Sequence, residues 1–188
     1  MENKEEKVNK PYLHNLYNEE QQKKLINWHN NLDTNKGLRA ELKRSSSPLE
    51  AMLCQATHSL KREFHYWPDK PEIIASIAGI LALVKVDTGV NGISYATQLA
   101  KPKEGNKSPL SESRFKKIIK SQTWNEFYMN IRRSVEILKG QVNICSLADG
   151  IIQWGKKNKS DEVAIGSESL EFQWAQDYYN EFSKHNNN

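Results

Sequence analysis

Several features that mark particular protein classes are scarce in this 188-residue sequence. Cysteine occurs only twice, at Cys54 and Cys145, far apart in a chain with no recognisable secretory leader. This usage predicts reduced, buried thiols and a cytoplasmic protein, and it argues against a disulfide framework. With 9 glycines and 6 prolines, the chain also has too few breakers for a fibrous repeat or a long disordered tract.

Long hydrophobic runs and recognisable catalytic motifs are missing as well. The longest apolar stretch, residues 73–86, is too short to span a bilayer. No glycine-rich phosphate loop or nucleophile elbow occurs. His58 and His65 lie seven residues apart, but no acidic residue or cysteine completes a metal-ligand spacing with them. We therefore expect no enzyme, no metal and no cofactor.

Apolar residues that recur every three to four positions dominate the rest of the chain, and no strand-like alternation is found. The pattern predicts an all-α protein, a compact bundle of about eight helices. The expected helices cover residues 25–32, 47–62, 71–84, 93–100, 114–120, 124–138, 147–154 and 170–182.

Two of these helices carry additional local signals. Ser47 and Pro48 predict the start of one helix. Its expected buried stripe is Leu49, Met52, Leu53, Ala56 and Leu60. Thr123 and Glu126 have the spacing of a capping box at the start of another helix, and Arg132 and Arg133 are expected to lie largely off its apolar stripe.

The ends of the chain are polar and lack an apolar period. The predicted division is a flexible N-terminal extension (1–18), an all-helical domain (19–184) and a loose tail (185–188). A polar loop at residues 101–110, rich in helix breakers, also allows two small lobes, 19–100 and 111–184.

Charge is distributed unevenly. The net charge of +4 is ordinary, but residues 101–140 hold ten Lys and Arg against four Glu, whereas from residue 161 onward acidic residues dominate. The excess of cations predicts a basic surface that binds phosphates, although a solvated helix face is an equally simple interpretation. The candidate nucleic-acid-binding residues are Arg39, Lys43, Arg44, Arg114, Lys117, Lys120, Arg132, Arg133, Lys156 and Lys157.

Five tryptophans could stack on nucleic-acid bases, as aromatic residues do in single-strand binders. Most of them fit the apolar stripes, which favours core packing. Trp67, in the breaker-rich connection at residues 66–68, is the one left open to base stacking.

Six blocks in order along the chain resemble a known family. They are residues 37–44, 93–100, 111–119, 131–133, 146–155 and 173–179. Together they are similar to the small subunit, the CasB family, of the type I-E CRISPR surveillance complex Cascade. Lys43 departs from the family pattern because arginine is usual there, and residues 158–169 form an insertion.

The resemblance implies a non-catalytic, all-helical subunit that holds guide RNA, target DNA and the displaced strand through basic residues. Its implied partners are these nucleic acids, the large and backbone subunits of Cascade, and a second copy of itself. It implies three basic stretches: Arg39, Lys43 and Arg44; Arg114 and Lys117; and Arg132 and Arg133. Lys156 and Lys157 follow a Trp-Gly pair.

Two other functions remain open from the residues alone. A helical adaptor could use the same basic surface to dock an acidic protein without meeting nucleic acid. A helix-turn-helix regulator would need a base-reading helix, for which residues 114–120 are the only candidate.

Overall fold

A computed structural model describes residues 13–16, 18–103, 105, 107–157, 166–167 and 169–186. These residues form ten α-helices, one 3-10 turn and two very short strands. In order they are α1 (Glu19–Thr34), α2 (Lys36–Arg44), α3 (Pro48–Met52), α4 (Gln55–Glu63), α5 (Pro71–Leu81), β1 (Val86–Asp87), η1 (Gly89–Asn91), α6 (Tyr95–Ala100), α7 (Glu112–Ile119), α8 (Trp124–Ile137), β2 (Gln141–Val142), α9 (Ile144–Lys156) and α10 (Leu170–Asn186). The predicted all-α class is confirmed.

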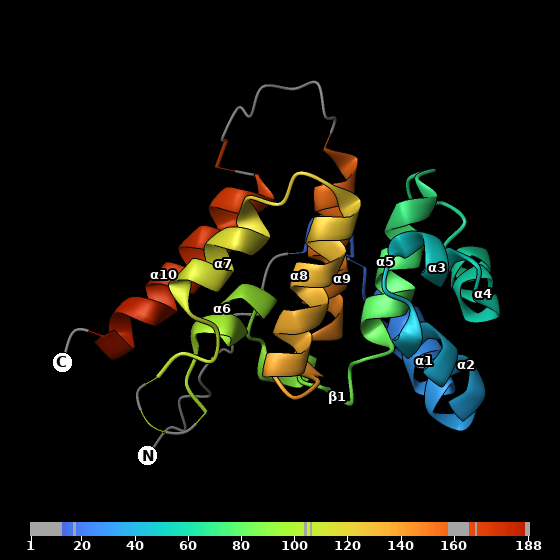
Figure 1. Cartoon of the computed structure of the whole chain (residues 1–188), viewed down its shortest axis with the longest axis horizontal. Coiled ribbons are helices and arrows are strands. Elements are labelled where there is room, and N and C mark those ends of the chain that lie inside the picture. The colour runs from blue at the N-terminus through green and yellow to red at the C-terminus, as the bar shows by residue number, and fades with distance from the viewer. Residues whose placement is uncertain are drawn as a thin grey trace, which may run out of the picture.

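The layout places α8 and α9 in the middle of the molecule (Figure 1). Helices α1 to α5 lie on one side of this pair, and α6, α7 and α10 lie on the other. Helix α5 contacts both α8 and α9, while α10 packs along α6. The two sides of the molecule therefore meet through the central pair.

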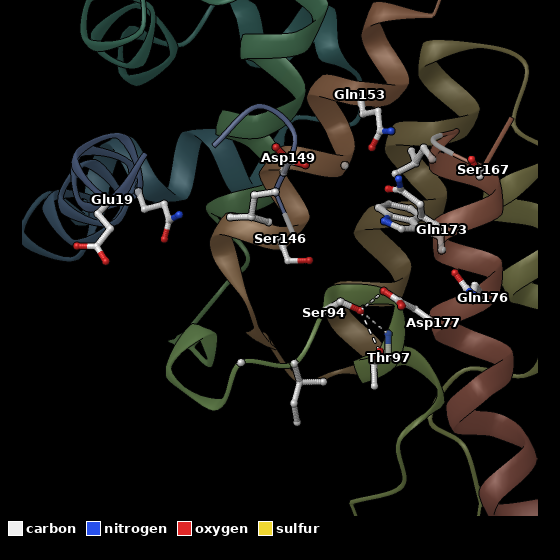
Figure 2. A pocket seen from close by; sticks show the side chains of 17 residues that line it. Glu19, Ser94, Thr97, Ser146, Asp149, Gln153, Ser167, Gln173, Gln176 and Asp177 are labelled. Carbon is white, nitrogen blue, oxygen red and sulfur yellow. Dashed lines mark hydrogen bonds between the residues drawn. The ribbon is translucent and has the colours of Figure 1, made fainter. Parts of the chain in front are cut away.

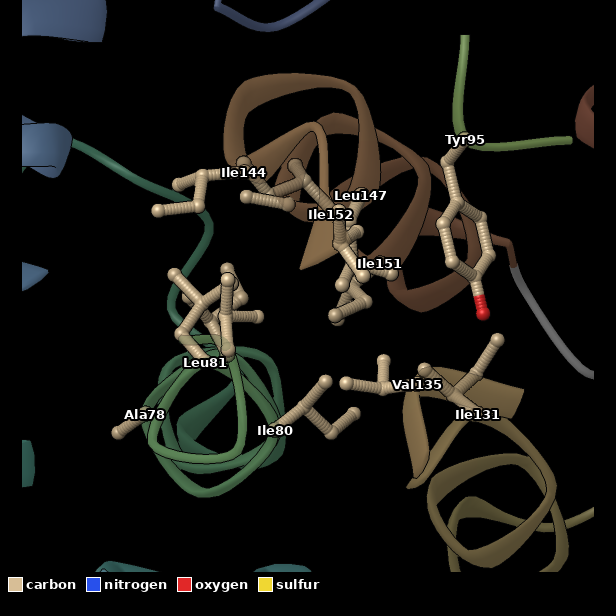
Figure 3. Packing of buried hydrophobic residues seen from close by; sticks show 14 of the residues in the cluster. Ala78, Ile80, Leu81, Tyr95, Ile131, Val135, Ile144, Leu147, Ile151 and Ile152 are labelled. Atoms are coloured by element: carbon tan, nitrogen blue, oxygen red, sulfur yellow. The ribbon is translucent and has the colours of Figure 1, made fainter. Parts of the chain in front are cut away.

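One core runs through these helices, and α5 is its most buried element. Every residue from Ile73 to Leu81 is buried, which explains why this stretch is apolar on nearly all sides. Figure 3 shows Ile80 of α5 facing Val135 of α8 and, above them, the aliphatic side chains of α9. Burial of such side chains contributes roughly 1.5–3 kcal/mol each.

Local sequence signals explain where α8 begins. The Thr123 hydroxyl accepts a hydrogen bond from the Glu126 amide, and the Glu126 carboxylate accepts one from the Thr123 amide. The predicted capping box is therefore confirmed. It satisfies two amides that the first helical turn leaves without partners.

The prediction of a single helix over residues 47–62 is wrong. The chain breaks at Leu53 and Cys54 into α3 and α4. Because the break changes the helical phase, Leu49 and Leu53 are 65% and 77% exposed, whereas Ala56 and Leu60 are buried as expected.

The expectation of no strands also needs correction. Strands β1 and β2 pair in parallel, Val86 with Gln141 and Asp87 with Val142. Two-residue strands are too short to show an alternation pattern in the sequence. Gly140 makes the approach possible, because its φ is +73° and a Cβ there would lie 2.8 Å from the Leu83 carbonyl oxygen.

Part of the predicted N-terminal extension is held against the helices. Leu16 is fully buried, and the backbone amides of His14, Asn15 and Leu16 all donate to the Asp149 carboxylate of α9. Residues 1–12 and most of the insertion at 158–169 lie outside the described residues. At the other end, α10 continues to Asn186.

Both cysteines are free and buried, as predicted. Burial raises the pKa of the Cys145 thiol to about 12, so the thiol stays protonated and unreactive at neutral pH. None of the helices formed by the described residues is long and apolar enough to cross a membrane.

Candidate nucleic-acid interface

Arg132, one of the predicted nucleic-acid-binding residues, points into the protein. Its guanidinium donates to the Lys43 carbonyl oxygen at 2.8 Å and to the Gly79 carbonyl oxygen at 3.3 Å. It also lies over the Tyr128 ring, 5.4 Å from the centroid, and its side chain is buried, with 9% exposure. The expectation that Arg132 lies off the buried face of α8 is therefore wrong. The charge is stabilised by carbonyl dipoles and an aromatic face.

A glycine makes room for this arrangement. The Tyr128 hydroxyl sits 2.1 Å from where a Cβ on Gly79 would be, so only glycine allows α5 and α8 to approach this closely. The hydroxyl exchanges hydrogen bonds with Ser45 and accepts one from Arg132. Burial raises the pKa of the Tyr128 phenol, so it remains a neutral hydroxyl beside the guanidinium.

Arg39 is engaged in a similar way. Its guanidinium donates to the carbonyl oxygen of Ala82, the C-cap of α5, and to that of Val84 just beyond the helix, and it forms an ion pair with Asp33 of α1. The C-terminal carbonyls of a helix carry partial negative charge, which a cation stabilises. Burial lowers the pKa of Arg39, but an arginine so close to acceptors keeps its charge. Arg39 thus joins three helices.

Arg114, Lys117 and Arg133 are exposed and face a common hollow of about 550 Å³ between α7 and α8. The apolar residues Ile118 and Ile137 also line it. The sequence predicted the spacing of Arg114 and Lys117 on one helix face. That Arg133 of the next helix converges on the same hollow required the tertiary structure.

A second hollow, of about 580 Å³, continues along the same helices and shares Lys117 with the first. Lys116 and Lys120 line it, and Lys116 forms an ion pair with Glu112 at 2.6 Å. The α7/α8 basic surface is defined here as the cations that line the two hollows. They are Arg114, Lys116, Lys117, Lys120 and Arg133.

Lys43 and Arg44 lie at the end of α2, outside these hollows. Burial, together with the positive charges of Arg39 and Lys85, lowers the pKa of Lys43. Arg44 is exposed. Positive charges therefore lie close together at this end of α2, and a bound anion would reduce the repulsion between them.

Lys156 and Lys157 close α9 and are both exposed. Lys156 donates a hydrogen bond to the Asn15 side chain, and Lys157 forms an ion pair with Glu171 of α10. The predicted site residues thus fall into separate groups. Arg39 and Arg132 are tied to backbone, whereas Arg114, Lys117, Lys120 and Arg133 share one surface.

The tryptophans contribute to the core. Trp67, which the sequence left open to base stacking, is 5% exposed and stacks on Phe64 with ring centroids 4.0 Å apart. Trp28 and Trp174 are buried as well, and Trp154 stacks on Phe127. Core packing is therefore confirmed for Trp28, Trp154 and Trp174, and the burial of Trp67 removes the possibility of base stacking that the sequence left open.

Comparison with known protein families gives a match over residues 38–179, about three quarters of the chain, to the family described as CRISPR-associated protein Cse2. The chain belongs to the Cse2 family. No curated protein and no solved structure matches. Family membership confirms the resemblance to the small subunit of Cascade.

Members of the Cse2 family are non-catalytic subunits of CRISPR Cascade. The matched region contains α7, α8 and the whole α7/α8 basic surface, whereas α1 lies before it. Among the described residues, no group of three or more His, Cys, Asp or Glu is arranged to hold a metal ion.

Two cations of this Cse2 chain were missed as candidates. Lys116 belongs to the α7/α8 basic surface, and Lys85 lies near Lys43. Lys116 is four residues after Glu112, which marks an exposed helix face in the sequence. Lys85 lies four residues after the end of α5, and no sequence signal indicates that α2 ends beside it.

Proposed function

We propose that this chain holds nucleic-acid backbone within the type I-E Cascade complex and carries out no chemistry itself. Its ligands are the guide RNA, the target DNA and the displaced strand, which it stabilises while the R-loop forms. It acts in the cytoplasm beside the large and backbone subunits and a second copy of itself. Family membership supports the assembly, and the α7/α8 basic surface supports the contact with nucleic acid.

The observation that carries the proposal is the continuity of the two hollows. Lys117 lies between them, with Arg114 and Arg133 on one side and Lys116 and Lys120 on the other. Successive phosphates of a strand can contact such a row in turn. Guanidinium groups suit these contacts because their planar fork matches two phosphate oxygens at once.

Backbone contacts fit the role of an RNA-guided complex. Base pairing between guide and target reads the sequence, and exchanging a DNA duplex for an RNA–DNA duplex is nearly balanced in free energy. Protein contacts with phosphates can therefore decide whether the exchange proceeds, without reading any base. Secondary contacts come from the four remaining exposed or partly exposed candidates, Lys43, Arg44, Lys156 and Lys157. The contacts of Lys156 and Lys157 are weaker, because another side chain already binds each of them.

The test is a salt titration of binding to single-stranded DNA and RNA by fluorescence anisotropy. The triple variant Arg114→Ala, Lys117→Ala and Arg133→Ala removes three proposed phosphate contacts. We expect weaker binding and a decrease of about 2 in the slope of log K against log salt concentration, because each contact with a single strand contributes about 0.7.

A matched control removes three exposed cations from α1, α2 and α4, with Lys23, Lys36 and Arg62 changed to alanine. This control has the same net charge as the first triple variant. Its slope of log K against log salt concentration should equal that of the wild type. If both triple variants lose the same slope, the α7/α8 basic surface has no special role. If the wild-type chain binds neither strand, the alternative of an adaptor that docks an acidic protein is favoured.

A further inference from the structure

A large polar cleft lies apart from the α7/α8 basic surface. It has a volume of about 1040 Å³, at the upper end of the range of roughly 300–1,000 Å³ for small-molecule sites. Its walls are the segment before α1 with the start of that helix, the entry to α6, and facing sides of α9 and α10. Figure 2 shows Ser146 and Asp149 of α9 on one side and Gln173 and Asp177 of α10 on the other.

The charge of this cleft is opposite to that of the α7/α8 basic surface. Its lining contains the carboxylates of Glu19, Asp149 and Asp177, while Lys, Arg and His are absent from the described residues that line it. Phosphates would be repelled from such a cleft. Nucleic acid is therefore disfavoured here, and a cationic ligand is favoured.

Asp149 is already engaged. Its carboxylate accepts backbone amides of His14, Asn15 and Leu16 at 2.5–3.1 Å, a concave arrangement of successive N–H groups that suits an anion. These bonds fix the segment that brings Leu13 into the cleft wall. Asp149 thus shapes the cleft without serving a ligand.

Of the two remaining carboxylates, Glu19 is exposed at the start of α1, and Asp177 is the one held between α6 and α10. It is half-buried and accepts a hydrogen bond from the Ser94 hydroxyl at 2.5 Å, and within the described part of the chain no basic side chain forms an ion pair with it. Burial raises its pKa, which reflects the cost of keeping this charge away from water. A cation placed against Asp177 would offset that cost.

The rest of the lining suits a peptide. The side-chain amide of Gln176 offers both a donor and an acceptor, as a peptide backbone does, whereas the amide of Gln173 is paired with the His14 ring. Ile93 and Leu170 add apolar surface against which the aliphatic stem of a long basic side chain can pack. The cleft thus combines a charge, paired hydrogen-bonding groups and apolar contacts.

We propose that this cleft binds an arginine-bearing peptide segment of a partner subunit, with the guanidinium against Asp177. The inference goes beyond nucleic-acid binding and depends only on the chain's place in a multi-subunit complex. The molecule then has two functional sides. One side, on α7 and α8, contacts nucleic acid, and the other, between α9 and α10, contacts protein.

The first experiment titrates the full chain with the peptide acetyl-Gly-Gly-Arg-Gly-Gly-amide while backbone amide NMR signals are recorded. Saturable shifts should appear at Ser94, Thr97 and Asp177. The same peptide with citrulline, the neutral counterpart of arginine, should give much smaller shifts. Binding of both peptides alike, or no saturable shift at these residues, overturns the proposal.

Two variants locate the contact. Asp177→Asn keeps an acceptor for Ser94 but removes the charge, and it should weaken binding of the arginine peptide about tenfold, the loss of one charged hydrogen bond. Glu63→Gln, on the exposed end of α4, removes the same charge elsewhere and should leave the affinity unchanged. An equal loss in both variants would indicate general electrostatic attraction and refute the site.

The second experiment asks whether the cleft acts in the complex. Asp177→Asn, which keeps an acceptor for Ser94, should lower incorporation of the chain into reconstituted Cascade, while its melting temperature stays at the wild-type value and its oligonucleotide binding matches that of Glu63→Gln. Incorporation at the wild-type level overturns the proposal. It is also overturned if a deoxythymidine oligonucleotide shifts the backbone amide signals of the residues that line the cleft. The triple variant of the α7/α8 basic surface should still bind the peptide, so failure of one proposal is distinguishable from failure of the other.

Discussion

Arg132 and Arg133 are neighbours in the chain, yet α8 directs them to opposite environments. Arg132 is buried and donates to the carbonyl oxygens of Lys43 and Gly79, in the last turns of α2 and α5. Arg133 is exposed in a hollow that it shares with Arg114. One arginine holds helices together, and the other is open to a ligand.

The difference shows that the role of an arginine depends on the acceptors within its reach. A step of one residue turns a side chain by about 100° around a helix, which is enough to move it from the core to the surface. Arg39 repeats the first case, since the carbonyl oxygens of Ala82 and Val84, at and just after the C-cap of α5, accept its hydrogen bonds. A cluster of basic residues in a sequence can therefore contain members that hold helices together and members that are open to solvent.

The largest effect should come from Arg132→Ala. The substitution leaves the carbonyl oxygens of Lys43 and Gly79 without their buried donor, and we expect the free energy of unfolding to fall by about 3 kcal/mol. Urea denaturation followed by circular dichroism measures the loss. A change no larger than that of Arg133→Ala would show that the two arginines do not differ as described.

A smaller loss is expected for Gly79→Ala. The new methyl group would overlap the Tyr128 hydroxyl and displace it from Ser45 and Arg132, at a cost of about 2 kcal/mol. Thermal unfolding of Gly37→Ala provides the control. A Cβ at Gly37 meets only Asn35 at 3.7 Å, so this variant should be as stable as the wild type or slightly more so.

The smallest effect on stability should come from Arg133→Ala, within about 0.5 kcal/mol, because the side chain is exposed. Its oligonucleotide affinity should nevertheless fall, and Arg133→Lys should restore most of it by returning the charge. Anisotropy titrations at fixed salt compare the three chains. Unchanged affinity in Arg133→Ala would remove this residue from the α7/α8 basic surface.

Features that depend on neighbours along the chain were predictable. The capping box of α8 joins residues three apart, and the apolar stripe of the same helix follows from its period. The exposed step from Arg114 to Lys117 on α7 is local as well. Such features need only the geometry of one helix.

Features that depend on distant acceptors were not predictable. The burial of Arg132 requires Lys43 and Gly79, which are 89 and 53 residues away. The only local hint is its position four residues after Tyr128, on the same side of the helix. Likewise, the break between α3 and α4 exposes Leu49 and Leu53 although their spacing fits one continuous helix.

The amides of His14, Asn15 and Leu16 donate hydrogen bonds to the Asp149 carboxylate, and these bonds make the segment before α1 part of the folded domain. The family match starts at residue 38, but residues before it contribute Leu16, Leu25 and Trp28 to the core. A fragment cut at residue 38 would expose apolar surface on α9, which α1 contacts, and would be prone to aggregate. The minimal autonomous folding unit therefore extends further toward the amino terminus than the segment by which the family is recognised.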